Sequence, residues 1–129
     1  MSAAVIAAVL LAGAAGAVVR YLVSRLAVRW SSGPPSRYRD FPWAVLIVNV
    51  VGSALGGVVL GLAEAGAVTA DARLILLTGF CGGLTTFSTF SVETIQLVLD
   101  GKGRTAAVSV LSNLALGILV AALAYLATR

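Results

Sequence analysis

The sequence contains no histidine, a single cysteine at Cys81, and charged residues at only 11% of its 129 positions. Without histidine, the chain cannot form a histidine-ligated zinc site, a histidine proton relay or a Ser-His catalytic triad. One cysteine excludes an intramolecular disulfide and a cysteine-based metal site. Soluble domains carry about 25% charged residues, so the low charge content indicates a protein built for lipid.

Long apolar segments dominate what remains. Hydrophobic residues make up 60% of the chain, and they gather in four runs at about residues 3–26, 42–62, 74–99 and 105–127. Each run exceeds the roughly 20 residues that a helix needs to cross about 30 Å of hydrocarbon. No basic segment precedes the first run, so we expect it to stay attached as a helix. We therefore predict an all-α membrane protein with four transmembrane helices in one domain, residues 1–129.

The basic residues are distributed unevenly between the two sides of the membrane. Consecutive helices alternate in direction, so the first and third loops share one side, which carries six basic residues against two on the other. The six are Arg25, Arg29, Arg37, Arg39, Lys102 and Arg104, and the two are Arg73 and Arg129. This bias predicts cytoplasmic first and third loops and termini outside. Topology thus accounts for the net charge of +4, and we expect no nucleic-acid partner.

Polar and helix-breaking residues interrupt the third apolar run. From Gly79 to Ser91 it reads GFCGGLTTFSTFS, a glycine pair followed by five hydroxyl side chains. In lipid, freed backbone groups are tolerated only where they are buried in protein or line a polar cavity. We therefore predict a third helix broken near the membrane midplane, where a transport protein keeps its working parts. Four helices are too few to enclose a polar path alone, so we also expect oligomerisation.

Three side chains in the second and third runs suit a small anion. Asn49 offers an uncharged amide donor among valines and isoleucines, although an asparagine that only joins helices is an equally good interpretation. Phe87 and Phe90 are three residues apart and share one helix face, which either faces lipid and core or lines a polar path. Aromatic edges carry partial positive charge. Such edges, together with hydroxyl and amide donors, would hold an anion weakly enough to release it.

Two charged residues lie within or at the end of apolar runs. Arg20 is either an arginine that extends to the interface from the end of the first helix or a vestibule charge that attracts anions. Glu93 lies well inside the third run, where an acid is either functional or paired with a basic group near the cytoplasmic end. The sequence leaves both roles open.

Motifs in three runs resemble those of one family. Residues 12–21 follow GGxxGAxxRY with the first glycine replaced, residues 42–53 follow PWxxxxxNxxGS, and residues 79–93 match GFxGGxTTFSTFSxE completely. On these motifs the chain resembles the CrcB/Fluc family of fluoride channels over essentially its whole length. The resemblance implies a passive channel in a prokaryotic plasma membrane that exports F− from the cytoplasm and lowers its toxicity.

The resemblance also implies an assembly and a set of site residues. The channel would be an antiparallel dimer of dual topology, with two pores and a structural Na+ that is not transported. Backbone carbonyls of Gly82 and Thr85 would bind this Na+. The implied pore residues are Asn49, Phe87 and Phe90, with Thr89 as a further hydroxyl, and the implied vestibule residue is Arg20.

The fourth run and the loop charges depart from the family pattern. Aligning on Gly117 puts Asn113 where the family commonly has a serine, and the adjacent Ser112 is the alternative contact. A homodimer in which one sequence inserts both ways requires nearly balanced loops, and six basic residues against two are not balanced. We therefore expect either a homodimer or a heterodimer with an oppositely oriented paralogue.

Two other functions fit parts of the sequence. A small four-helix proton-coupled antiporter needs an acid in the membrane, and Glu93 is the only candidate. A non-transporting membrane scaffold would explain glycines at four-residue spacing but not the hydroxyl cluster beside the break. No nucleophile, base and orienting group can be assembled from these residues, so we predict that the protein is not an enzyme.

Overall fold

The computed structural model describes residues 2–30 and 40–129, and all regular secondary structure within them is helical. The elements are α1 (Ala3–Trp30), α2 (Trp43–Glu64), α3 (Ala70–Leu74), the π-helical segment η1 (Ile75–Cys81), α4 (Gly82–Leu84), α5 (Phe87–Leu99) and α6 (Gly103–Thr128). Four stretches are long and apolar enough to cross a membrane: Ala3–Arg29, Trp43–Glu64, Ala70–Leu99 and Gly103–Thr128. The predicted all-α fold with four spans is confirmed. The single domain over the whole chain stays a prediction.

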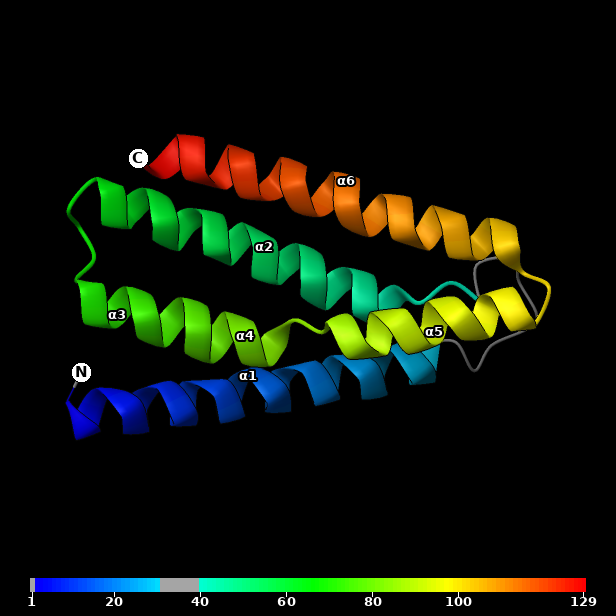
Figure 1. Ribbon diagram of the computed structural model, residues 1–129, viewed down its shortest axis with the longest axis horizontal. Helices are drawn as coiled ribbons and strands as arrows, with labels where there is room; N and C mark the ends of the chain where they lie inside the picture. Colours follow the sequence, from blue (N-terminus) through cyan, green and yellow to red (C-terminus); the bar gives the residue numbers. More distant parts are fainter. Residues whose placement is uncertain (1, 31–39) are drawn as a thin grey trace.

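The four spans lie side by side, in the order α6, α2, the segmented third span and α1 (Figure 1). Both termini and the connection between α2 and α3 lie at one end of the molecule, and the turn between α5 and α6 lies at the other. Successive spans therefore alternate in direction. Arg37 and Arg39, which contribute to the predicted charge bias, lie outside the described residues.

Glycines let two pairs of spans approach closely. In the pair α2–α6, a Cβ added at Gly57 would lie 3.0 Å from the carbonyl carbon of Ala121. In the pair formed by α1 with η1 and α4, a Cβ added at Gly16 would lie 2.8 Å from the backbone nitrogen of Leu84. Only glycine permits this separation of backbones, which is the role that small residues have in packing membrane helices.

The third span is bent by η1 and then broken at Thr85 and Thr86, so the predicted interruption is confirmed. Both threonines have extended backbones, with ψ of 158° and 119°. The preceding glycine pair, Gly82 and Gly83, stays helical, so the hydroxyl residues mark the break. The break falls at the centre of the 30-residue stretch Ala70–Leu99.

Threonine hydroxyls explain why the helix stops and restarts at this point. Thr85 Oγ1 donates a hydrogen bond to the carbonyl of Cys81 (2.9 Å), inside the last turn before the break. Thr86 Oγ1 accepts a hydrogen bond from the N–H of Thr89 (3.2 Å) and so caps the start of α5. Side-chain bonds of this kind replace helical bonds at a helix terminus.

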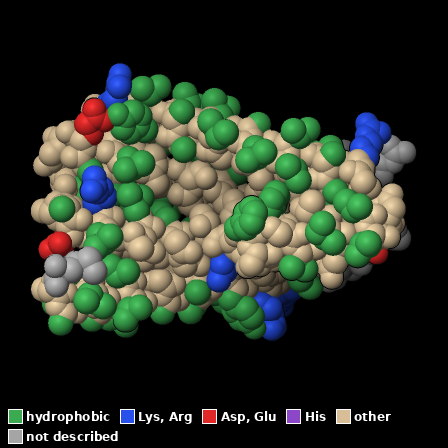
Figure 2. Space-filling model, viewed as in Figure 1, with side chains coloured by type: hydrophobic (Ala, Val, Ile, Leu, Met, Phe, Trp, Pro, Cys, Tyr) green, Lys and Arg blue, Asp and Glu red, His purple; other side chains and the backbone are tan. Residues whose placement is uncertain are grey.

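The buried apolar core is small for a chain of this length. It consists of Val45, Leu46, Val48, Val59, Cys81, Leu84, Leu97 and Ala106. Large apolar side chains are exposed on all four spans, and Figure 2 shows hydrophobic groups across the whole of one face. Such a surface is stable in contact with lipid tails or another subunit, and in water its exposure would cost about 25 cal/mol per Å².

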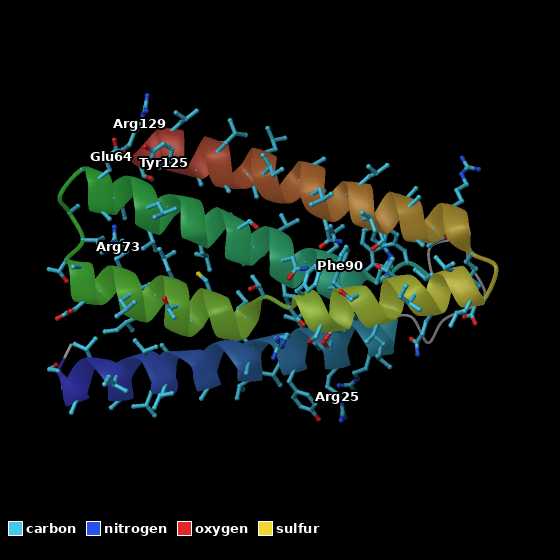
Figure 3. The ribbon with its side chains drawn as sticks, in the orientation of Figure 1. Arg25, Glu64, Arg73, Phe90, Tyr125 and Arg129 are labelled. Atoms are coloured by element: carbon cyan, nitrogen blue, oxygen red, sulfur yellow. The ribbon has the colours of Figure 1, made fainter. Side chains whose placement is uncertain are left out.

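Polar contacts join the ends of the helices. At the end that holds the α5–α6 turn, Lys102 Nζ lies 2.9 Å from Asp40 Oδ1, and this hydrogen bond raises the pKa of the Lys102 amine. At the opposite end, Tyr125 donates a hydrogen bond to the Glu64 carboxylate, and the Arg129 guanidinium carbon lies 5.7 Å from the centroid of the Tyr125 ring (Figure 3). The Tyr125–Glu64 bond links α6 to α2, and the Lys102–Asp40 pair links the segments that precede these two helices.

Candidate functional site

A cavity of about 330 Å³ lies at the break in the third span. Its walls come from α2, from the break with the first turn of α5, and from α6. The lining residues are Asn49, Ser53, Thr85, Thr86, Phe87, Phe90, Asn113 and Leu114. Figure 3 shows Phe90 reaching from α5 toward α2 near the break. The lining is uncharged, and it combines amides and hydroxyls with two phenyl rings.

The side chain of Asn49 bridges the break. Its Oδ1 accepts a hydrogen bond from the backbone N–H of Thr86 (2.9 Å), and its Nδ2 lies 3.4 Å from the Thr86 carbonyl oxygen. Nδ2 also donates to Asn113 Oδ1 (3.1 Å), and Asn113 Nδ2 donates to the Ser109 carbonyl (2.9 Å). Asn49 is half-buried, and its Oδ1 satisfies the Thr86 N–H, which the break leaves without a helical acceptor. One chain of hydrogen bonds therefore connects α2, the break and α6.

Phe87 and Phe90 form a tilted aromatic pair at the mouth of the cavity. Their ring centroids are 6.0 Å apart and their planes meet at 39°. Phe87 is 81% exposed in the isolated subunit, whereas Phe90 is half-buried. The ring of Phe87 therefore adds little to the packing of this subunit, and its position beside a polar cavity suits a contact with a partner or a permeating ion.

Two of the predicted pore hydroxyls lie beside the cavity and do not line it. Thr89 is exposed and accepts a hydrogen bond from the Thr86 hydroxyl (3.1 Å), so it belongs to the hydroxyl cluster that caps α5. Ser112 is half-buried on α6, and it precedes the lining residue Asn113. Of the two alternatives on the fourth helix, Asn113 is the one that faces the cavity.

Arg20 and Glu93, the charged residues of the apolar runs, have different environments. Arg20 donates a hydrogen bond from Nη1 to the carbonyl of Thr85 (3.0 Å), which brings a positive charge to the edge of the cavity. Glu93 is half-buried on α5, and its Oε2 is buried without a hydrogen-bond partner among the described residues. No ion pair to a basic group is formed by Glu93 within this part of the chain.

The sequence reasoning missed four residues around the cavity. Ser53, Thr86 and Leu114 line it, and Ser109 is fully buried with a hydroxyl that has no partner among the described residues. Helical spacing would have found two of them. Ser53 follows Asn49 by four residues and Ser109 precedes Asn113 by four, so each shares a helix face with its asparagine.

The described residues contain no group of three His, Cys, Asp or Glu side chains that could hold a metal ion, so a cation at the break would be bound by neutral oxygens, of which the broken backbone supplies two. The helical donor to the Gly82 carbonyl would be the N–H of Thr86, and this N–H donates to Asn49 instead. The Gly82 carbonyl is thus left for another partner, and Gly82 is exposed. The Thr85 carbonyl accepts from Arg20 and keeps a second lone pair. Neutral carbonyl oxygens are the kind of ligand that hard cations take.

The chain has four apolar spans, and the third is broken beside an uncharged polar cavity. This arrangement defines a membrane transport protein. The family model described as "CrcB-like protein, Camphor Resistance (CrcB)" matches residues 7–125. The chain therefore belongs to the CrcB/FluC family of fluoride-specific ion channels, which confirms the resemblance read from its motifs. This is a family of channels and not of enzymes.

Relatives of known name cover almost the whole chain. The protein named "Fluoride-specific ion channel FluC" of Pyrococcus furiosus is 41% identical, over 96% of this chain and 95% of its own length. The protein of the same name from Pyrococcus horikoshii is 38% identical over 100% and 99%. That of Thermus thermophilus is 41% identical over 91% and 87%. The antiporter and scaffold alternatives find no support in these matches.

Proposed function

We propose that this protein is a passive, fluoride-selective channel that lets F− leave the cytoplasm down its gradient and so protects the cell. The observation that carries the proposal is the cavity at the helix break, which is lined by neutral amides and hydroxyls and by two phenyl rings. Neutral donors hold a small anion without a fixed positive charge in the lining, so the ion can leave again. The described residues show no coupling machinery, and a passive pore needs none.

In this proposal the ion first meets Arg20 at the vestibule and then passes the residues that line the cavity. Arg20 raises the local anion concentration at the vestibule, because its guanidinium lies at the edge of the cavity. The edges of Phe87 and Phe90 and the amides of Asn49 and Asn113 then replace water around the ion. Thr89, Ser112 and Ser109 provide further hydroxyls beside this path.

The working assembly is proposed to be an antiparallel dimer with Na+ on its axis. Support comes from the exposed ring of Phe87, which borders a cavity that one subunit leaves open, and from the Gly82 carbonyl that lacks its helical donor. Carbonyls of Gly82 and Thr85 from both subunits would bind Na+, which would hold the two breaks together. Two copies of this chain in opposite orientations would satisfy this arrangement, and so would one copy paired with an oppositely oriented paralogue.

In the favoured orientation the end that carries the α5–α6 turn faces the cytoplasm and both termini lie outside. Arg25, Arg29, Lys102 and Arg104 support it, since they lie toward that end and basic residues are retained on the cytoplasmic side. The host membrane would be the plasma membrane of a prokaryote.

Complementation tests the cellular role. A bacterial strain without fluoride export, carrying this chain on a plasmid, should grow at fluoride concentrations that stop the same strain with an empty plasmid. The Phe87→Ile variant, expressed to the same level, should give no protection. If the chain gives no protection alone or together with its paralogue, the proposed function is wrong.

A further inference from the structure

Two arginines on α1 lie outside the cavity, and the proposed transport uses neither of them. Arg25 and Arg29 are four residues apart, so they share one face of the helix and lie about 6 Å apart along its axis. Both residues are exposed. The span α1 lies at one edge of the bundle in Figure 1, and Figure 3 shows Arg25 directed away from the other three spans. This face of α1 therefore meets the surroundings of the subunit.

Large apolar side chains accompany the two arginines on this face. Leu22 and Leu26 belong to the same helical stripe as Arg25 and Arg29, and they are 52% and 49% exposed. Exposed leucines on a membrane span are stable against lipid tails. A guanidinium beside lipid tails is costly unless it reaches the interface or binds an anion.

The depth of the arginines follows from the rise of the helix. Arg20 reaches the break at Thr85, which lies at the centre of the third span. Arg29 follows Arg20 by nine residues, or about 13 Å along the axis. Half of the hydrocarbon core is about 15 Å thick. Arg29 therefore lies near the edge of the hydrocarbon at the end that carries the α5–α6 turn, and Arg25 lies about one turn deeper, from where a long side chain reaches the headgroups.

Tyr21 holds the Arg25 guanidinium against the outer face of α1. Arg25 Nη1 donates a hydrogen bond to the Tyr21 hydroxyl (3.1 Å), and its guanidinium carbon lies 5.9 Å from the centroid of the Tyr21 ring. This bond uses one of several guanidinium donors, and it compensates no charge. Among residues 2–30 and 40–129, no carboxylate forms an ion pair with Arg25 or Arg29. Both positive charges are therefore available to an anion from outside the subunit.

We propose that Tyr21, Arg25 and Arg29 form a binding site for the phosphate of an anionic phospholipid, in the leaflet at the α5–α6 end of the subunit. Phosphate is the anion that a bilayer presents at this depth, and guanidinium groups bind its oxygens through paired, charge-assisted hydrogen bonds. Two neighbouring positive charges favour an anionic headgroup over a zwitterionic one. The acyl chains of the bound lipid lie along the exposed leucines. This site goes beyond transport and does not depend on which ion the cavity conducts.

Lipid titration of the purified protein tests the proposal. Phosphatidylglycerol added to the protein in a neutral detergent should raise the thermal midpoint saturably, and native mass spectrometry should detect the bound lipid. Phosphatidylcholine should act more weakly because its headgroup has no net charge. Inorganic phosphate at the same concentration should have no effect because it has no chains to cover the leucines. An equal response to either of these two probes would overturn the proposal, and so would no response to phosphatidylglycerol.

Variants locate the response on the protein. Replacing both arginines, Arg25→Gln with Arg29→Gln, should weaken phosphatidylglycerol binding about tenfold or more, because the charged hydrogen bonds to phosphate are lost. Arg104→Gln is the matched control, since Arg104 is an exposed arginine at the same end of the molecule but on α6. It should bind the lipid as the wild type does. Equal weakening in the control and in the double variant would show that only net charge matters and would overturn the proposal.

Size-exclusion chromatography separates a lipid site from a contact with a second subunit. The double glutamine variant should keep the oligomeric state of the wild type, because the proposal assigns this face to lipid. A variant that becomes monomeric and still binds phosphatidylglycerol normally would assign the face to a subunit contact and overturn the proposal. Circular dichroism checks that helix content is unchanged, and the single variants Arg25→Gln and Arg29→Gln give the same comparison with a smaller change.

Discussion

Arg20 of α1 donates a hydrogen bond of 3.0 Å to the backbone carbonyl of Thr85, across 65 positions of sequence. The carbonyl belongs to the broken part of the third span, where helical donors are missing. A guanidinium at this place therefore has two effects: it satisfies a backbone acceptor, and it brings positive charge to an otherwise uncharged cavity.

Substitutions at Arg20 separate these two effects. Arg20→Lys keeps the charge but loses the planar donor group, so we expect thermal stability and fluoride flux to fall well below wild type, by about 1.5–3 kcal/mol in the case of stability. Arg20→Ala should lower both further. Fluoride efflux and thermal unfolding of the purified protein provide the measurements. Wild-type flux and stability in Arg20→Lys would show that charge alone matters.

Gly83 should not tolerate a methyl group. A Cβ at this position would overlap the backbone of Gly13, whose Cα would lie 3.0 Å away, and backbone atoms on two packed helices cannot move aside easily. We expect Gly83→Ala to destabilise the fold by about 3 kcal/mol. Gly103→Ala is the matched control, since nothing lies within 4 Å of its added Cβ. Equal heat resistance of the two variants would contradict this packing of α1.

Gly82 tests the proposed dimer axis. In one subunit an added Cβ at Gly82 would meet its nearest neighbour, the Leu77 carbonyl oxygen, at an ordinary 3.7 Å. The single subunit of Gly82→Ala should therefore fold normally. If Gly82 lies against a second copy of the chain and a Na+ bound between the two, the variant should elute as a monomer in size-exclusion chromatography. Added Na+ should then no longer raise its thermal stability. A stable, sodium-responsive Gly82→Ala dimer would place the axis elsewhere.

Phe87→Ile should abolish fluoride flux and leave the fold intact. The Phe87 ring is 81% exposed, so its loss removes little packing from the subunit, while isoleucine offers no positively polarised ring edge to an anion. Leu99→Ile is a matched control at the far end of α5, where the side chain is 79% exposed and remote from the cavity lining. Comparable flux in the two variants would remove Phe87 from the pore.

The ion pair between Asp40 and Lys102 predicts a small pH dependence. The hydrogen bond to Asp40 raises the pKa of the Lys102 amine in the folded state. A raised amine pKa means that the stabilisation is complete below the usual lysine pKa and is lost as the pH rises through the folded value. Asp40→Asn should slightly lower the thermal midpoint near pH 7, and the difference should disappear in alkaline buffer and at high salt. A midpoint difference that persists there would contradict this origin.

Periodicity and composition were sufficient for the coarse fold. Runs of more than 20 apolar residues have one stable arrangement in lipid, and each became a span. The interruption of the third run was also predictable, but its position was not. Gly82 and Gly83 are the strongest helix breakers of the motif, yet the chain leaves the helix at Thr85, because threonine hydroxyls provide the bonds that stop and restart it.

The site was predicted in part, because several of its relations are long-range. Asn49, Phe87, Phe90 and Asn113 were identified as candidates, and all four line the cavity. The contacts that position them could not be read from the sequence. No local pattern indicates that Asn49 bonds to the backbone of Thr86, or that its amide meets Asn113 on the fourth span. Such contacts depend on how α2 and α6 pack against the break.

Fluoride efflux from liposomes that contain this chain alone tests the central claim most directly. Vesicles loaded with equal fluoride and chloride, and given an ionophore to balance charge, should release F− rapidly to a fluoride electrode while Cl− stays inside. If fluoride is not released, the same measurement with the co-reconstituted paralogue decides between half of a heterodimer and the absence of a channel. Equal release of both anions, or no release from either preparation, would contradict a fluoride-selective pore.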